Sequence, residues 1–257
     1  MTDLAAIASH LDAVLGTETI PDYPGAFNGV QVANEGSITR IAASVDVSRR
    51  VIDAAARSGA NLLLVHHGMM WGGAQRITGG LYERLRLLLA HNIAVYSSHL
   101  PLDAHPTFGN NVLLARTLGL EPAGGFARYR TIDVGIRGEC DCETASLFSR
   151  ADAFARMHGG VARSTEITPS RCTHRWAICT GAGASSETLL EAQALEIDTL
   201  IVGEGPHHTA VAADDAGIVV IYAGHYATET LGVTALAEHL TSTFAIPSAF
   251  IAAPTGL

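Results

Sequence analysis

The chain alternates between short apolar runs and longer segments in which apolar residues recur every three or four positions. This recurrence predicts a helix over residues 3–15, with Thr2 as candidate N-cap and Gly16 beyond its end. Further helices are predicted over 48–59, 81–91, 109–118, 144–157, the segment after Ser185, a short segment up to Gly217, and 226–240. Strands are predicted over 38–47, 61–65, 93–97, 131–137, 176–180, 199–202 and 218–223. Strands that alternate with helices indicate the α/β class, with largely buried strands.

The strand predicted over residues 61–65 is followed by two adjacent histidines, His66 and His67, and then by Gly68. Neighbouring residues on a strand point to opposite faces of a sheet. The two imidazoles therefore converge only if the strand has ended and the backbone turns there, which Gly68 permits. A metal centre would use two imidazoles at such a place. The simpler alternative is one hydrogen-bonded histidine beside one solvated histidine.

Two other apolar strands also end in residues that bind metals. His99 and Asp103 follow the strand over 93–97, and His225 and Glu229 follow the strand over 218–223. In open α/β sheets, ligands bind at the carboxyl ends of the strands. His225 and Glu229 are four residues apart at a helix start, so both lie on one helix face. A single His-x-x-x-Glu pair is usually structural, and it is the combination of three strand ends that predicts a metal site.

The candidate ligands offer nitrogen and oxygen but no sulfur. Two or three imidazoles with two carboxylates are more than one four-coordinate zinc ion needs. Because a carboxylate can bridge two metals, two ions are plausible. Zinc, iron(II), manganese and nickel all accept such ligands. We therefore expect two interlinked α/β layers with metal ligands at the carboxyl ends of the strands.

The segment Glu121–Gly125 resembles a boundary because it contains proline and two glycines. We therefore expect a metal-binding α/β domain formed by residues 1–124 plus 224–257. A second α/β domain is expected over residues 125–223. The composition is uniform along the chain, so this division rests on the turn signals alone.

Composition and charge exclude several classes of function. The 257 residues are 48% hydrophobic and 16% charged, with a net charge of −9, which makes nucleic acid an unlikely partner. All sixteen basic residues are arginine, so a Schiff-base lysine and a P-loop lysine are both excluded. No apolar stretch is long enough for a membrane span. The start at Met1 lacks a basic region typical of a secretory signal, so we expect a cytoplasmic protein.

Four cysteines are too few and too irregularly spaced for a disulfide framework; they are Cys140, Cys142, Cys172 and Cys179. The Cys140-Asp141-Cys142 segment is a weak candidate for metal binding, and ordinary reduced thiols are the preferred interpretation.

Other polar positions have a structural explanation beside a functional one. The segment from Gly181 to Ser185 could hold a phosphate on backbone amides, but a tight turn before a helix is the better interpretation. Asp46 is either close to the active site or a helix cap. Ser97 and Ser98 have no ordered base, so serine catalysis is not expected.

Together, five stretches of this sequence resemble the Nif-three-like dinuclear metal centre family, whose members are known as type 2 GTP cyclohydrolase I proteins. The resemblance extends from residue 28 to 229. Its stretches are Asn28–Val32, Val65–Gly68, His99–Pro106 with Gly109–Asn111, Gly203-Glu204, and Gly224–Glu229. Val30 replaces the leucine usual in short members, and His207 and His208 follow Glu204 where no histidines are expected. These two histidines either extend the site or form an exposed helix start, which we favour.

The resemblance implies a ligand set. His66 and Asp103 would bind one ion, His67 and His225 the other, and Glu229 would bridge the two ions. His99 would lie outside this set, as a group that supports a ligand or contacts substrate.

The resemblance also implies a function, a dinuclear divalent-metal-dependent hydrolase in which metal-bound hydroxide is the nucleophile. GTP would be converted to 7,8-dihydroneopterin triphosphate, so the expected partner is a small-molecule substrate, a nucleotide among the candidates. A homohexamer is also implied. The alternative is a non-catalytic metal-binding or metal-trafficking adaptor protein.

Overall fold

The computed structural model describes residues 2–256 and confirms the α/β class. The chain forms two compact units, each with its own sheet. The first unit contains residues 2–102 together with 232–253, and the second contains 103–231 together with 254–256. The domain boundaries expected at 124/125 and 223/224 remain a prediction. Within the described residues, no helix is long and apolar enough to cross a membrane.

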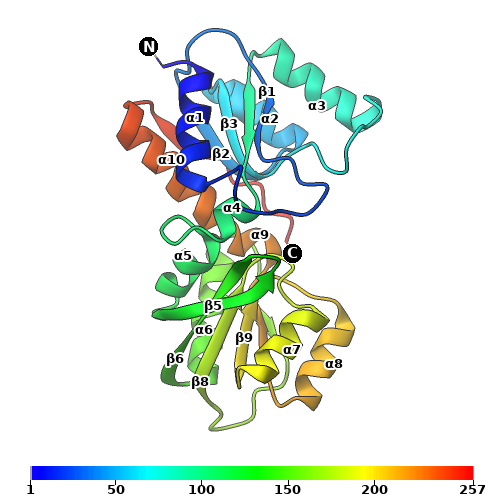
Figure 1. The fold of residues 1–257 in the computed structure, drawn as a ribbon, viewed down its shortest axis with the longest axis vertical. Coiled ribbons are helices and arrows are strands. Elements are labelled where there is room, and N and C mark those ends of the chain that lie inside the picture. Colours follow the sequence, from blue (N-terminus) through cyan, green and yellow to red (C-terminus); the bar gives the residue numbers. More distant parts are fainter. Residues whose placement is uncertain (1, 257) are drawn as a thin grey trace. The chain divides into compact units, whose positions relative to one another are not determined.

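The first unit is built on a five-stranded sheet in the order β1-β4-β3-β2-β11 (Figure 1). Strands β2, β3, β4 and β11 are parallel, and β1 is antiparallel to β4. The strand bounds are Gly29–Val32 for β1, Ile41–Asp46 for β2, Leu62–His67 for β3, Ala94–Ser97 for β4 and Ser248–Phe250 for β11. The parallel strands β2, β3 and β4 are almost fully buried, as expected for a sheet that helices cover on both faces.

Helices cover both faces of this sheet. Helices α2 (Arg49–Ser58) and α3 (Gly79–Ala90) pack on one face, where Ile52 and Leu88 join a single apolar cluster with Leu63. Helix α1 (Leu4–Leu15) and helix α10 (Thr230–Phe244) lie on the other side, next to each other (Figure 1). On each helix, the apolar residues that recur every three or four positions form the face that packs on the sheet.

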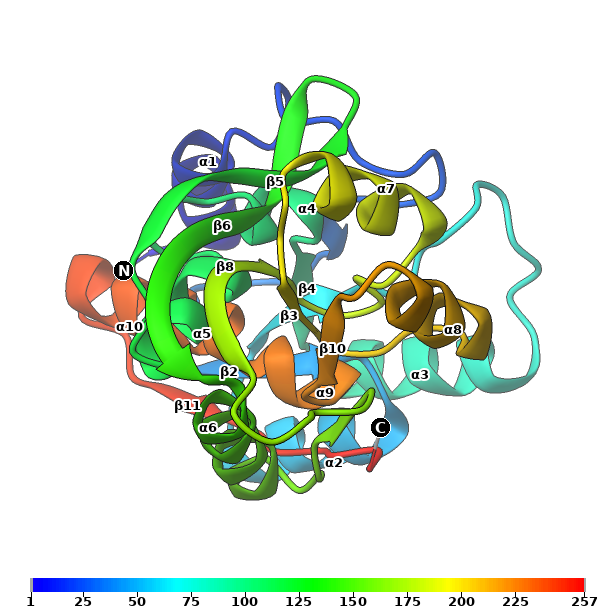
Figure 2. The same ribbon diagram turned by 90° about the horizontal axis from the view of Figure 1, so that it is seen from below.

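The second unit has a six-stranded mixed sheet in the order β5-β6-β8-β9-β10-β7. Figure 2 shows its long curved strands β5, β6 and β8 side by side. Strands β8, β9 and β10 are parallel, and the remaining pairs are antiparallel. The strand bounds are Pro122–Tyr129 for β5, Ile132–Glu143 for β6, Arg163–Ser164 for β7, Cys172–Cys179 for β8, Thr199–Val202 for β9 and Val219–Tyr222 for β10.

Successive side chains of β8 point to opposite faces of the sheet, and they divide the core of the second unit into two layers. Trp176 and Ile178 face a cluster that includes side chains of α5 (Asn110–Thr117) and α6 (Thr144–Met157). Ala177 faces a second cluster with α7 (Ser186–Ala194) and α8 (His207–Asp215). Successive side chains of a strand point to opposite faces, so one strand supplies both layers. Two short helices complete the chain, α4 (Leu100–Asp103) and α9 (His225–Thr228).

Three local predictions are wrong. The N-cap of α1 is Asp3, whose carboxylate accepts the Ala6 N–H at 2.9 Å, and not Thr2. The helix expected over 226–240 is broken at Glu229 and continues to Phe244. The strand expected to end before His66 continues to His67.

Asn111 links three segments of the second unit. Its side-chain amide donates to Val134 O at 2.9 Å and to Asp103 O at 3.3 Å, and its Oδ1 accepts the Thr180 N–H at 2.8 Å. The residue is 1% exposed, so water cannot replace these bonds.

We expect Asn111→Ala to lower the free energy of unfolding by about 1–3 kcal/mol, since it leaves buried polar groups unpaired. Chemical denaturation measures this change. Thr117→Ala, at an exposed position of the same helix, is the control and should stay within about 0.5 kcal/mol of the wild type. Equal stability of the two variants would contradict the role given to Asn111.

Candidate metal centre

His66 lies at the carboxyl end of β3 and is fully buried. Its Nδ1 is 2.9 Å from the carbonyl oxygen of Ser98, which follows β4. A carbonyl oxygen only accepts, so Nδ1 carries the proton and Nε2 presents a lone pair. A backbone acceptor therefore fixes both the orientation and the tautomer of this imidazole, as in many metal sites.

Two carboxylates hold His67 and His99 in the same way. His67 Nδ1 is 2.9 Å from Asp46 Oδ1 at the end of β2, and His99 Nδ1 is 2.9 Å from Asp22 Oδ1. Asp46 therefore orients a histidine, and the helix that follows is capped by Ser48 instead. Sequence reasoning left both roles of Asp46 open, and it did not identify Asp22.

Asp22 is a buried carboxylate in the loop before β1. It also accepts from the side-chain amide of Asn28 at 2.8 Å and from the Leu100 N–H at 3.0 Å. Burial raises the pKa of Asp22, but the hydrogen bond and charge of His99, with the bonds from Asn28 and Tyr23, outweigh burial and lower it. The group is therefore an ionised acceptor for His99 at neutral pH.

The three histidines converge. His66, His67 and His99 each offer one ring nitrogen, and these atoms all lie within 4.8 Å of one another. The rings of His66 and His67 are 4.7 Å apart although both residues belong to β3, so the expected turn before His66 is not what brings them together. His67 is the last residue of β3, so no further strand residue separates the two faces of the sheet there. The two imidazoles can therefore approach each other beyond the end of the strand. The predicted convergence of this pair is confirmed.

In the second unit, His225 begins α9 directly after β10 and lies between two carboxylates. Its Nε2 is 3.2 Å from Glu229 Oε2, and its Nδ1 is 2.9 Å from Glu204 Oε1. Burial lowers the pKa of His225, but the hydrogen bonds and charges of Glu229 and Glu204 outweigh burial and raise it to about 9. The surroundings therefore favour positive charge at this position, whether as a proton or as a bound cation.

Glycines leave room for Glu229, which is 3% exposed. A Cβ at Gly181 would lie 2.2 Å from Glu229 Oε1, and Gly181 has a φ of +62°. A Cβ at Gly203 would lie 2.8 Å from the Cα of His225. Residues 181–185 form a turn before α7, as expected, and Ser185 caps that helix. Gly181 of this turn also forms one wall around the Glu229 carboxylate. This second role was not identified from the sequence.

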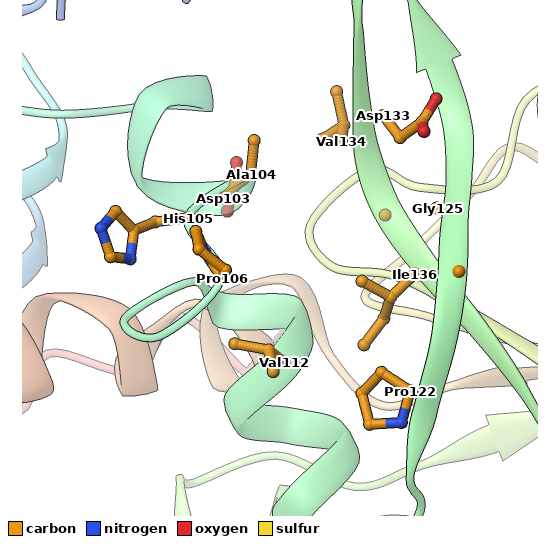
Figure 3. Close-up of a pocket in the computed structure, with 12 residues that line it drawn as sticks. Asp103, Ala104, His105, Pro106, Val112, Pro122, Gly125, Asp133, Val134 and Ile136 are labelled. Atoms are coloured by element: carbon orange, nitrogen blue, oxygen red, sulfur yellow. The ribbon is translucent and has the colours of Figure 1, made fainter. Parts of the chain in front are cut away.

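Asp103 is buried in the second unit, and its Oδ1 accepts from the Asn110 side chain at 2.8 Å. A cavity of about 310 Å³ lies beside it, between residues 103–106 and the β5–β6 hairpin (Figure 3). Its walls include Val112, Pro122 and Ile136. The acidic residues that line the cavity are Asp103 and Asp133. In Figure 3, the His105 ring points away from the hairpin. A cavity of this size suits a small ligand.

His207 and His208 are exposed at the start of α8. Among residues 2–256, no cluster of three potential metal ligands includes either of them. The prediction of an exposed helix start is confirmed.

Comparison with known proteins supports the resemblance over the whole chain. The family described as Duf34/NIF3 (NGG1p interacting factor 3) matches residues 2–255. A Deinococcus radiodurans protein named GTP cyclohydrolase 1 type 2 homolog is 41% identical over 91% of this chain and 88% of its own. A Pyrococcus abyssi protein of the same name is 38% identical over 98% of both chains. The structure of the protein TTHA1606 from Thermus thermophilus has a TM-score of 0.87 and 32% identity, with both chains fully covered.

Gly181→Ala tests the space around Glu229. The added methyl group would displace the buried carboxylate, so we expect divalent-metal affinity to fall about 10- to 100-fold, the usual cost of disturbing the surroundings of a ligand. Isothermal titration with Zn²⁺ or Mn²⁺ measures the change.

Gly217→Ala is the matched control for backbone strain. Gly217 has a φ of +69°, close to that of Gly181, but a Cβ there meets nothing within 4 Å. If both variants lose the same affinity, strain alone explains the effect and the steric role of Gly181 is wrong.

Proposed function

Because the chain belongs to the DUF34/NIF3 family, we propose that it is a hydrolase that depends on two divalent metal ions. The observation that carries the proposal is the set of oriented imidazoles. In the first unit, the proposed ligands His66 and His67 have Nδ1 hydrogen-bonded to oxygen, and one ring nitrogen of each lies within 4.8 Å of the other and of a ring nitrogen of His99. Histidines at the carboxyl ends of strands with their ring nitrogens gathered in this way match the requirements of a metal site.

We propose the ligand set that the family pattern gives. His66 and Asp103 bind one ion, His67 and His225 bind the other, and Glu229 bridges them. The donors are nitrogen and oxygen, which suits zinc, iron(II), manganese or nickel. Bound ions of this kind would supply Lewis-acid activation of water.

His99 is proposed to act on the substrate side of the centre. Its Nδ1 donates to the ionised Asp22, which fixes the ring and leaves Nε2 to exchange a proton with the substrate. The edge of the His99 ring also meets Trp71 at a centroid distance of 5.1 Å, which limits the orientations of the ring. His99 thus has the hydrogen bond and the packing of a proton carrier.

The proposed reaction is hydrolytic opening of the GTP ring towards 7,8-dihydroneopterin triphosphate. Support comes from the relatives named GTP cyclohydrolase 1 type 2 homolog, which match nearly the whole chain.

We also propose a homohexamer, which light scattering tests directly. A monomer at micromolar concentration would contradict the hexamer.

Metal stoichiometry tests the ligand set. Protein purified without chelator should contain close to two equivalents of divalent metal by elemental analysis. Glu229→Gln should retain less metal than His99→Ala, because Glu229 is proposed to contact both ions and His99 neither. Equal retention by the two variants would remove Glu229 from the bridging role.

Turnover of GTP tests the reaction. The metal-loaded wild type should form dihydroneopterin triphosphate, detected by chromatography and fluorescence after oxidation, and Glu229→Gln should lose at least about 100-fold in rate. His208→Ala, at an exposed position outside the ligand set, should keep full activity.

Two tightly held ions without GTP turnover would exclude this substrate, and a screen of nucleotides and phosphate esters would follow. Metal that a mild chelator removes, with no turnover of any substrate, would favour a metal-trafficking adaptor.

A further inference from the structure

Strand β6 carries two cysteines on one side, at a place where its pairing with β8 is irregular. Its pairing with β8 shifts by one residue between Glu139, opposite Arg175, and Cys142, opposite Thr173. One extra residue in this stretch makes a β-bulge, which bends a strand and redirects its side chains. Cys140 and Cys142 are both half-buried against the cluster beneath α6, while Asp141 between them is exposed.

The two thiols are in contact, and their surroundings differ. Their Sγ atoms are 3.5 Å apart. Cys140 Sγ donates to the carbonyl oxygen of Thr173 at 3.3 Å, which requires its proton. Cys142 Sγ instead accepts from Nη2 of Arg150 at 3.6 Å, so the two sulfurs have different hydrogen-bond partners.

Arg150 is held in place by a second bond. Its other terminal nitrogen, Nη1, donates to the carbonyl oxygen of Leu118 at the end of α5. Burial, with the hydrogen bond and charge of Cys142, raises the pKa of Cys140 to about 12. Cys140 therefore stays a thiol at neutral pH, and Cys142 is the sulfur beside the cation.

A metal does not account for this pair. Within the part of the chain that the structure describes, no cluster of three potential metal ligands contains either cysteine. The carboxylate between them, Asp141, contacts His174 at 3.4 Å and is 87% exposed. Two thiols in contact, one bonded to a carbonyl oxygen and the other to a guanidinium, match the requirements of thiol–disulfide exchange instead.

We propose that Cys140 and Cys142 form a thiol–disulfide redox site, distinct from the candidate metal ligands, which a low-molecular-weight disulfide such as glutathione disulfide oxidises. The Cys142 thiolate attacks one sulfur of glutathione disulfide, forms a mixed disulfide and releases one glutathione thiolate. Cys140 loses its proton to solvent and attacks Cys142 Sγ, and the second glutathione leaves as a thiolate. Two protein thiols and one glutathione disulfide thus become one protein disulfide and two glutathione thiols.

Cys140 Sγ and Cys142 Sγ need to move only a short distance to form a disulfide. A disulfide has an S–S distance of about 2 Å, so the two sulfurs approach by about 1.5 Å, within the reach of side-chain rotation and a flexible bulge. The pair of electrons that the cysteines lose reduces glutathione disulfide, so no other oxidant is needed.

The test uses the folded full-length protein with glutathione disulfide, followed by intact mass and peptide mapping. We expect the mass to fall by two hydrogens, reversibly with dithiothreitol. The tryptic peptide over residues 138–150 contains both cysteines and should carry the internal disulfide. The same change is expected in the Cys172→Ser, Cys179→Ser double variant. Persistent glutathione adducts on the wild type, a disulfide with Cys172 or Cys179, or no reaction would each overturn the proposal.

Single variants test the order of attack. Cys140→Ser should accumulate a stable glutathione adduct on Cys142, and Cys142→Ser should react with glutathione disulfide at least about tenfold more slowly. Arg150→Met should slow formation of the adduct in the Cys140→Ser background, with circular dichroism as the check on folding. Equal rates for the two cysteine variants would contradict the assignment of Cys142 as the attacking sulfur.

Discussion

One hydrogen bond, repeated at each histidine of the candidate site, sets the geometry on which the proposed chemistry depends. One ring nitrogen of each imidazole is tied to an oxygen at 2.9 Å, and the other can bind a metal or a proton. The pairs are His66 with Ser98 O, His67 with Asp46, His99 with Asp22, and His225 with Glu204. An imidazole that can neither rotate nor change tautomer is a preorganised ligand, and little ordering remains to be done when an ion binds.

The topology of the sheets explains why these acceptors are available. Asp46, His67 and His99 lie at or just beyond the carboxyl ends of the neighbouring parallel strands β2, β3 and β4. In the second unit, Gly181, Glu204 and His225 lie at or just beyond the same ends of β8, β9 and β10. At these ends the hydrogen-bond ladder stops, so side chains and backbone groups turn towards each other instead of into a layer. Both units use the rule that ligands bind at the carboxyl edge of parallel strands.

This rule also explains what the sequence could and could not predict. The strand over 199–202 and the helix over 144–157 follow from apolar period alone, and histidines that directly follow apolar runs mark the strand ends. Asp22 could not be found in this way, because it meets His99 across 77 residues of sequence. The break at Glu229 and the need for glycine at position 181 are likewise tertiary effects, since a helical pattern continues through 226–240 and only the fold brings Gly181 next to the Glu229 carboxylate.

Charge gives a further reason to place divalent cations among these residues. Within the second unit, Glu229 and Glu204 both contact His225, and their combined effect makes a positive charge favourable there. Within the first unit, Asp22 and Asp46 give two of the histidines anionic partners. Surroundings of this kind repel an anion and attract a cation. A triphosphate substrate would therefore need the ions for binding as well as for activating water. Metal and nucleotide would then bind with positive cooperativity, so each would strengthen the binding of the other.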